Sequence, residues 1–318
     1  MTFVRTVLGD IDPSELGVTY AHEHLIIDGG RPVQMVPDFD LGDVDSMTVE
    51  VSAAAALGLR SVVDAMPCDA GRSAEKLAEL SRRTGVHVVA PTGLHHDRYY
   101  GPTHWSARIT VDELAELFTL DVTDGVDAYD YAGPVVRRTA HRAGVIKIAG
   151  SDSGPSDRDR RVFEAAAEAH RRTGVPILTH CEGGTGALEQ IRLLADRGVD
   201  LAHVVVSHVD KIVDREYHRE ILATGALAEY DQGFRWGDLR NGTLELLRWM
   251  AEDGLTDRIV LGMDAARRHY YVVFGGAPGL TWLLATFIPM LAEAGIDATT
   301  RKALFVSNPA RAYAFARR

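Results

Sequence analysis

The chain has 318 residues, 46% of them apolar, and a formal net charge of −11; this is enough apolar sequence for one large core and argues against nucleic acid as a partner. Two cysteines are too few for a disulfide framework and fit a reducing compartment. No apolar leader follows Met1 and no apolar run approaches the roughly 20 residues that span a bilayer, so we expect a cytoplasmic protein without a membrane partner.

The first elements predicted in chain order are two short strands. They lie over residues 2–8 and 17–25, and the segment 9–13 between them carries glycine and proline and is expected to be a turn. This pattern predicts an N-terminal β-hairpin. The following segment, 29–45, also carries glycine and proline and is expected to be a loop.

From residue 48 onward, helical and strand patterns alternate along the chain. Helices are predicted over 48–57, 73–84, 111–120, 134–143, 157–173, 185–197, 214–223 and 241–252, with three more that begin near residues 280, 298 and 309. Short apolar strands are predicted over 60–66, 86–90, 144–149, 175–180, 203–208, 225–230 and 258–264.

Eight strands that alternate with helices favour one architecture. Strands that are apolar on both faces belong to parallel sheets covered by helices. With the strand at 17–25 counted first, the pattern predicts an α/β protein with a (β/α)8 (TIM) barrel, in a single domain over residues 1–318. The alternative is an open doubly wound sheet, but no glycine-rich phosphate loop follows the first strand.

Two histidines stand one residue apart near the end of the first barrel strand. Side chains at i and i+2 of a strand point to one face, so His22 and His24 converge while Glu23 points away. Two converging imidazoles form half of a metal site, although a chance pair on a surface strand would show the same spacing. The other half has to come from other strands.

Polar side chains also stand at the carboxyl ends of four later strands, where the active site of such a barrel forms. They are Lys147, His180, His208 and Asp264. One inward histidine is usually a hydrogen-bonded core group, whereas four histidines and an aspartate at strand ends indicate a metal site.

Lys147 lies between Ile146 and Ile148, in a strand predicted to be buried on both faces. A buried ammonium without a partner is costly, so this side chain either points outward between the helices or is chemically modified. Carboxylation by CO₂ would convert the lysine into an anion able to bridge two metal ions.

With these residues in place, the chain resembles the phosphotriesterase family of the amidohydrolase superfamily over nearly its full length. The motifs that carry the resemblance are His22-x-His24, Val-Ile-Lys147-Ile, Ile-Leu-Thr-His180, Val-Ser-His208 and Leu-Gly-Met-Asp264. The resemblance implies a buried ion held by His22, His24, carboxylated Lys147 and Asp264, and a more exposed ion held by Lys147, His180 and His208. Zn²⁺ is the expected metal at both positions, with Mn²⁺, Co²⁺ or Fe²⁺ as alternatives.

The chemistry implied by this resemblance is hydrolysis of a small molecule. Two metal ions share a hydroxide that attacks the substrate, while the exposed ion polarises a carbonyl or phosphoryl oxygen. Asp264 is then the catalytic residue that accepts the proton and delivers it to the leaving group. We therefore expect a metal-dependent hydrolase with no serine or cysteine nucleophile, and we also expect a homodimer.

The loop sequences bear on the substrate. Lactonases of the family that act on acyl lactones carry Thr-Gly-x-Tyr after the third strand, whereas His95 stands at the tyrosine position here. The segment that follows Asp264 is more similar to members that hydrolyse phosphorylated sugar lactones. We expect a lactonase for a small sugar-type lactone with a phosphate or carboxylate group. A phosphotriesterase or aryl esterase, or an N-acyl amide hydrolase, is the alternative for the same centre, and a non-catalytic metal-binding barrel is a third.

Six residues in loops at the barrel mouth are candidate substrate-binding residues. They are His95, Arg98, Tyr99, Arg235, Arg267 and Arg268. Guanidinium groups suit phosphate and carboxylate, and the arginines stand out in an acidic protein. They could equally pair with nearby acids such as Asp97, Asp231 and Asp238, so the sequence leaves anion binding and structural pairing open.

Overall fold

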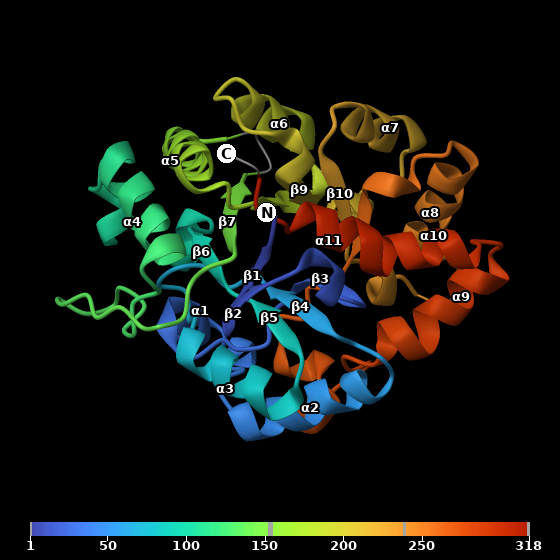
Figure 1. Cartoon of the computed structure of the whole chain (residues 1–318), viewed down its shortest axis with the longest axis horizontal. Helices are drawn as coiled ribbons and strands as arrows, with labels where there is room; N and C mark the ends of the chain where they lie inside the picture. Colours follow the sequence, from blue (N-terminus) through green and yellow to red (C-terminus); the bar gives the residue numbers. More distant parts are fainter. Residues whose placement is uncertain (1, 152–154, 238–239, 317–318) are drawn as a thin grey trace.

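Parallel strands close into a barrel in a computed structural model of the chain, which describes residues 2–151, 155–237 and 240–316 (Figure 1). The barrel strands are β3 (Thr19–Glu23), β4 (Ser61–Asp64), β5 (His87–Val89) continued by β6 (Pro91–Gly93), β7 (Val145–Gly150), β8 (Ile177–Cys181), β9 (Val204–Ser207), β10 (Leu227–Tyr230) and β11 (Ile259–Leu261). Sequential strands pair in parallel. The last strand meets the first where the backbone nitrogen of Asp264 donates to the carbonyl of His22 at 2.9 Å. The predicted (β/α)8 barrel is confirmed.

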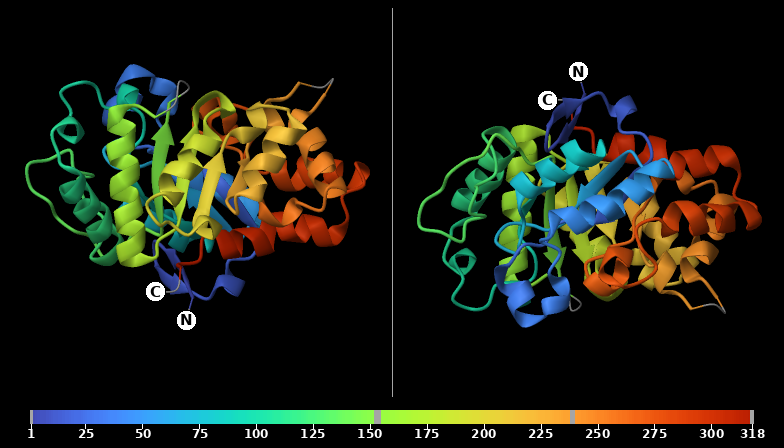
Figure 2. Two further views of the ribbon diagram at one scale, coloured as in Figure 1. Left: turned by 90° about the horizontal axis from the view of Figure 1, so that it is seen from above. Right: turned by 90° about the horizontal axis from the view of Figure 1, so that it is seen from below.

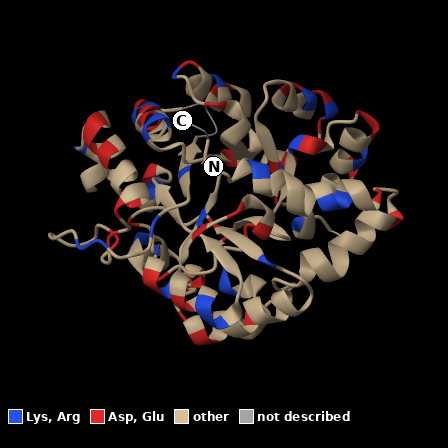
Figure 3. Ribbon diagram, in the orientation of Figure 1, with Lys and Arg blue, Asp and Glu red and all other residues tan. Residues whose placement is uncertain are grey.

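Helices follow the strands and cover the outside of the barrel (Figure 1). They are α1 (Gly30–Met35), α2 (Val44–Ala56), α3 (Ala74–Thr84), α4 (Val111–Thr123), α5 (Asp157–Thr173), α6 (Ala187–Ala195), α7 (Arg215–Ala223), α8 (Gly242–Glu252), α9 (Ile288–Glu293), α10 (Ala298–Lys302) and α11 (Asn308–Ala312). Helix α1 lies in the segment predicted to be a loop. Many of the charged residues lie on the outer helices (Figure 3). Within the described ranges, no helix has both the length and the apolarity needed to cross a bilayer.

One buried apolar side chain from each strand fills the amino-terminal half of the barrel interior. These side chains are Ala21, Val63, Val89, Val145, Leu178, Val205, Leu227 and Val260. Because residues two apart on a strand face the same side, the next inward positions on β7, β8 and β10 hold Lys147, His180 and Glu229. The polar site therefore begins one layer above these eight apolar side chains, which form the interior plug of the barrel.

The N-terminal hairpin lies at the end of the barrel where both ends of the chain are found (Figure 2). Its strands, β1 (Val4–Thr6) and β2 (Gly9–Ile11), are antiparallel, and Val4 packs into the barrel plug. The predicted hairpin is present, but its predicted partner strand is wrong. Residues 9–11 were assigned to the turn, and three-residue strands are too short to show the alternation that identifies a strand.

The helix predicted over 134–143 is absent, and that part of the chain forms an irregular excursion from the barrel (Figure 1). An isolated bridge joins Asp127 to Arg138. The Asp127 carboxylate accepts hydrogen bonds from the backbone nitrogens of Tyr131 at 2.9 Å and Arg137 at 2.5 Å. The Asp127 carboxylate thus accepts hydrogen bonds from backbone N–H groups that would otherwise need partners within a helix. This tertiary contact outweighs the helical pattern of the local sequence.

Candidate metal centre and pocket

All six predicted metal ligands meet at the carboxyl end of the barrel. The Nε2 atoms of His22 and His24 lie 3.5 Å and 3.2 Å from the same carboxylate oxygen, Oδ1 of Asp264. The Nδ1 of His180 lies 2.7 Å from the Nε2 of His208. The two groups meet where the rings of His22 and His208 lie 5.0 Å apart between centroids, and the Nζ of Lys147 lies 3.4 Å from the Nε2 of His22. The convergence of His22 and His24 is as predicted.

Lys147 points into the barrel and is only 1% exposed. Besides His22, its ammonium contacts the hydroxyl of Ser207 at 3.5 Å, and within the described chain no carboxylate forms an ion pair with it. Burial lowers the pKa of Lys147 to about 8, although the carboxylates of Asp264 and Glu229 act in the opposite direction. The alternative of an outward-pointing lysine is therefore wrong.

Two buried carboxylates at the carboxyl end of β10, Glu229 within the strand and Asp231 just after it, orient two of the histidines. The Nδ1 of His22 lies 3.1 Å from Oε2 of Glu229, and the Nδ1 of His208 lies 2.6 Å from Oδ2 of Asp231. A proton held on Nδ1 by a carboxylate leaves the lone pair on Nε2, the atom that faces the other ligands. Neither residue was predicted as part of the site, although Glu229 in an apolar strand carries the same signal as Lys147.

This donor set fits divalent metal ions. Ligand atoms of His22, His24 and Asp264 all lie within 4.8 Å of one another, and two imidazoles with a carboxylate suit Zn²⁺. Burial lowers the pKa values of His180 and His208, which keeps both rings neutral and able to bind a metal. The pair made by these two rings lacks an anionic ligand, which a carboxylated Lys147 would supply.

The backbone around the ligands is strained and tightly packed. Asp264 and His208 both adopt left-handed backbone conformations, with φ of 49° and 66°. Glu23, predicted to point away from the histidines, holds the turn at Asp264 by accepting hydrogen bonds from the backbone nitrogens of Met263 at 2.7 Å and Ala265 at 3.2 Å. The strain is thus supported by a buried carboxylate next to the two histidines.

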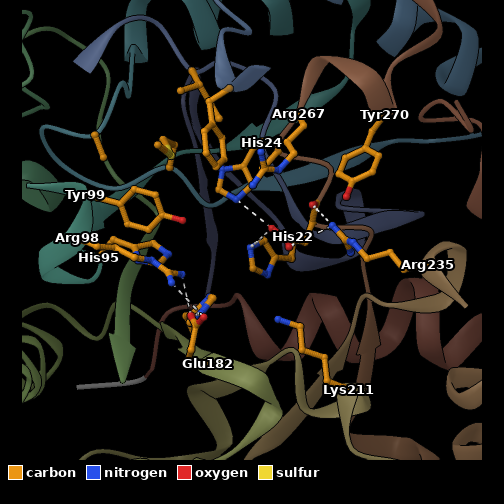
Figure 4. A pocket seen from close by; sticks show the side chains of 17 residues that line it. His22, His24, His95, Arg98, Tyr99, Glu182, Lys211, Arg235, Arg267 and Tyr270 are labelled. Atoms are coloured by element: carbon orange, nitrogen blue, oxygen red, sulfur yellow. Dashed lines mark hydrogen bonds and ion pairs between the residues drawn. The ribbon is translucent and has the colours of Figure 1, made fainter. Parts of the chain in front are cut away.

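A cavity of about 250 Å³ opens above the ligands (Figure 4). Five of the six predicted substrate-binding residues line it, namely His95, Arg98, Tyr99, Arg235 and Arg267. Arg268 does not: its Nη1 donates to the carbonyl of Asp40 at 2.9 Å, and its guanidinium lies 3.9 Å from the ring centroid of Phe274. Spacing along a loop does not determine which of two adjacent arginines turns inward.

The arginines that line the cavity differ in how many hydrogen bonds and ion pairs they form with other protein groups. Arg98 donates to both oxygens of Glu182, at 3.2 Å and 2.9 Å. Arg235 donates to the carbonyls of Met263 and Asp264, whereas Arg267 lies 3.9 Å from a carboxylate oxygen of Asp38. Two of the carboxylate partners suggested by the sequence have other partners: Asp97 pairs with Arg158, and Asp231 faces His208. The third, Asp238, lies outside the described residues.

Lys211 also lines the cavity and was not predicted. Figure 4 shows its ammonium group directed into the pocket. In the part of the chain that the structure describes, that group has no hydrogen bond or ion pair, so it is a cation available to a ligand. Its position three residues after His208, in the loop that follows β9, was the only signal in the sequence.

The chain is similar to known proteins both in sequence and in structure. The Phosphotriesterase family profile matches residues 2–313. A phospho-furanose lactonase from Mycoplasmopsis synoviae (strain 53) is 33% identical over 325 residues, covering 98% of this chain and 92% of that protein. A solved amidohydrolase from Mycoplasma synoviae has a TM-score of 0.94 at 30% identity, covering 100% of this chain and 93% of that one. The lactonase Lmo2620 from Listeria monocytogenes has a TM-score of 0.90 at 28% identity, covering 99% of this chain and 100% of that one.

Proposed function

This chain belongs to the phosphotriesterase family and is a metal-dependent hydrolase, and we propose that it is a lactonase for small sugar-type lactones that carry an anionic group, foremost a phosphate. The observation that carries this proposal is the pair of cations, Lys211 and Arg267, beside a cavity of about 250 Å³ above the ligand cluster. A small cavity with cationic walls accommodates a furanose lactone, whereas a long alkyl chain would have to desolvate these charges.

The residues that would hold two ions follow from the contacts. His22, His24 and Asp264 would hold the buried ion, and His180 and His208 the exposed one, with carboxylated Lys147 shared between them; Zn²⁺ is the metal we propose. When bound, the ions supply a nucleophile from water at neutral pH and polarise the lactone carbonyl.

Carboxylation of Lys147 is part of this proposal. The neutral amine of Lys147 attacks CO₂, a nitrogen–carbon bond forms, and one proton leaves, which yields a carbamate anion. A lysine whose ammonium is buried, has no carboxylate partner within the described chain and lies 3.4 Å from a histidine ligand loses little by giving up its own charge. The carbamate then provides the anion that the His180–His208 pair lacks.

Asp264 is placed to carry the proton. Burial acts to raise its pKa, but the electrostatic interaction with the His208 ring, the hydrogen bond with His24 and the nearby guanidinium of Arg235 hold the pKa of this carboxyl well below its usual range. The carboxylate is therefore ionised and can accept a proton as the ester bond is attacked. Returning that proton to the ring oxygen of the lactone produces the hydroxy acid and restores the ionised Asp264.

The anionic group of the substrate is assigned to Lys211 and Arg267. Lys211 has a free ammonium in the described chain, and Arg267 has a single distant carboxylate partner at 3.9 Å while its guanidinium stacks on Phe39. A phosphate held by one of these two cations would orient the lactone with its carbonyl toward the histidines.

A three-substrate comparison tests the proposed function. The metal-loaded protein is assayed on a phosphorylated furanose lactone, an aryl phosphotriester and an N-acyl amino acid, and each assay is repeated after removal of metal with a chelator. We expect the lactone to have the highest kcat/KM and its turnover to disappear with the metal. Preference for the phosphotriester or the amide, or turnover that survives the chelator, would contradict the proposal.

A further inference from the structure

His180, like His22 and His208, has a carboxylate beside its outer nitrogen, but this carboxylate is partly exposed. The Nε2 of His180 forms a hydrogen bond of 2.7 Å with Oε2 of Glu182, two residues further along the chain. Glu229 and Asp231, the partners of His22 and His208, are fully buried, whereas the Glu182 side chain is 25% exposed. Glu182 has no part in the chemistry assigned above.

Side chains from a strand and a loop converge on the Glu182 carboxylate: His180 from β8, and His96 and Arg98 from the loop after β6. Besides His180, the fork of Arg98 donates at 2.9 Å and 3.2 Å, and the Nε2 of His96 lies 3.1 Å from Oε2 (Figure 4 shows the Arg98 contact). The carboxylate therefore accepts both hydrogen bonds of a guanidinium fork and lies within 3.1 Å of two imidazole nitrogens. His96 and Arg98 follow β6, and Glu182 follows β8, so this carboxylate ties together two loops of the mouth.

The tautomer of His180 follows from this contact. A carboxylate held by a guanidinium fork accepts hydrogen bonds, so the neutral imidazole of His180 donates from Nε2 and keeps its lone pair on Nδ1. Nδ1 is the atom that faces His208 at 2.7 Å. Without an acceptor at Glu182, the ring would be free to place its proton on Nδ1 or to rotate.

We propose that Glu182 is the positioning residue of the exposed metal ion: it presents Nδ1 of His180 to that ion, and Arg98 holds Glu182 in place for this task. The inference rests on the proposed function, because it assumes that His180 binds metal. It also assigns Arg98 to Glu182 rather than to substrate, since both of its terminal nitrogens are already engaged. The buried ion, whose ligands do not touch Glu182, should not depend on this contact.

Metal affinity tests the inference without reference to turnover. Zn²⁺ binding is measured against a series of chelator-buffered free concentrations for the wild type, Glu182→Gln and Glu182→Met. The matched control is Glu189→Met, which removes a similarly exposed glutamate that pairs with Arg160 on the outside of the barrel. Loss of a partner that orients a histidine ligand typically costs roughly 10- to 100-fold in metal affinity.

We expect two binding steps in the wild type, of which only the weaker changes. It should weaken by about 10- to 100-fold in Glu182→Met and less in Glu182→Gln, whose amide oxygen still accepts a hydrogen bond. Arg98→Gln should weaken the same step by a smaller factor, and Glu189→Met should leave both steps unchanged. Circular dichroism checks that each variant is folded.

Different results of this experiment would contradict the proposed function and the positioning role of Glu182. Wild-type protein that binds fewer than two ions would contradict the proposed function itself. The positioning role would be overturned if the wild type binds two ions and both affinities are unchanged in Glu182→Met. It would also be overturned if both affinities are weakened equally in a folded variant. A third wild-type ion that is lost in Glu182→Met would overturn it as well, since the cluster of His96, His180 and Glu182 would then be a metal site of its own.

Discussion

Arg235 donates through Nη2 to the carbonyl oxygen of Asp264 at 2.6 Å and lies 3.3 Å from Oδ2 of the same residue. Asp264 occupies a left-handed conformation that an aspartate adopts only with support, and the guanidinium provides part of that support. The other carboxylate oxygen, Oδ1, faces His22 and His24. The two oxygens of Asp264 therefore have different neighbours, cationic on one side and imidazole on the other.

Asp264→Asn should separate the two roles assigned to this residue. An amide can still bind an ion through its oxygen but cannot accept a proton, so we expect at least one ion to remain bound. We expect kcat to fall by about 10²- to 10⁴-fold, the usual range for a general acid–base group. Metal content by elemental analysis and steady-state kinetics on the same preparation check this. A kcat near that of the wild type would show that Asp264 is only a ligand.

Lys147→Ala should lose metal and activity together, because the shared anion disappears. Short carboxylates such as formate or acetate should restore part of both, since they fit the space left by the side chain and provide the missing oxygen ligands. The measurement is ion content and lactone turnover with increasing carboxylate. An intact protein mass that shows no CO₂ adduct on gentle ionisation, together with full metal content in Lys147→Ala, would contradict carboxylation.

Adjacent arginines provide an internal control for anion recognition. Arg267 lines the cavity, whereas Arg268 points to Asp40 and Phe274. A hydrogen bond to a charged group is worth roughly 1.5–3 kcal/mol, so Arg267→Ala should lower kcat/KM on a phosphorylated lactone by about 10- to 150-fold. Lys211→Ala should have an effect of similar size, and both variants should leave a small neutral lactone almost unaffected.

Arg268→Ala is expected to change turnover of both lactones little and equally. Equal losses on charged and neutral substrates in Arg267→Ala would indicate a structural arginine. A larger selective loss in Arg268→Ala than in Arg267→Ala would mean that the loop after β11 is arranged differently when substrate is bound.

Acid should destabilise the fold through His218. Its ring is enclosed between the carbonyl of Ile212 at 2.9 Å and the hydroxyl of Tyr230 at 2.8 Å, and burial lowers its pKa to about 4. Between the ordinary value of about 6.5 and this value the unfolded chain binds a proton that the folded chain does not, so stability falls as pH falls through that window. From pH 7.5 to 5 this single group should remove about 2 kcal/mol from the free energy of unfolding.

Urea unfolding of metal-stripped protein at the two pH values measures this effect. The His218→Gln variant should lose about 2 kcal/mol less than the wild type over the same interval, because glutamine does not titrate. Identical losses in both proteins would show that the acid sensitivity resides in other groups.

The ligand set was predictable from the sequence because barrel geometry is regular. Val145 and Leu178 belong to the interior plug, so Lys147 and His180, two residues later, had to face inward at the carboxyl end. The same reasoning applied to Leu227 would have found Glu229. A charged residue within an apolar strand is the same signal at Lys147 and at Glu229.

The loops were less predictable, because side-chain direction there depends on tertiary contacts. Arg267 and Arg268 are neighbours with the same chemistry, yet only the first faces the cavity. Glu182 and Lys211 belong to loops after different strands, and their relation to the cavity exists only once the barrel closes. The helix predicted over 134–143 failed for a related reason, since the Asp127 carboxylate binds backbone groups several residues away.

One comparison tests the central claim most directly: kcat/KM of the fully metal-loaded wild type on a phosphorylated five-membered sugar lactone and on the same lactone without its phosphate. With Lys211 and Arg267 at the mouth, the phosphorylated lactone should be preferred by at least about 10-fold, the lower limit for one hydrogen bond to a charged group. Equal kcat/KM for the two lactones, or a preference for the uncharged one, would contradict the account.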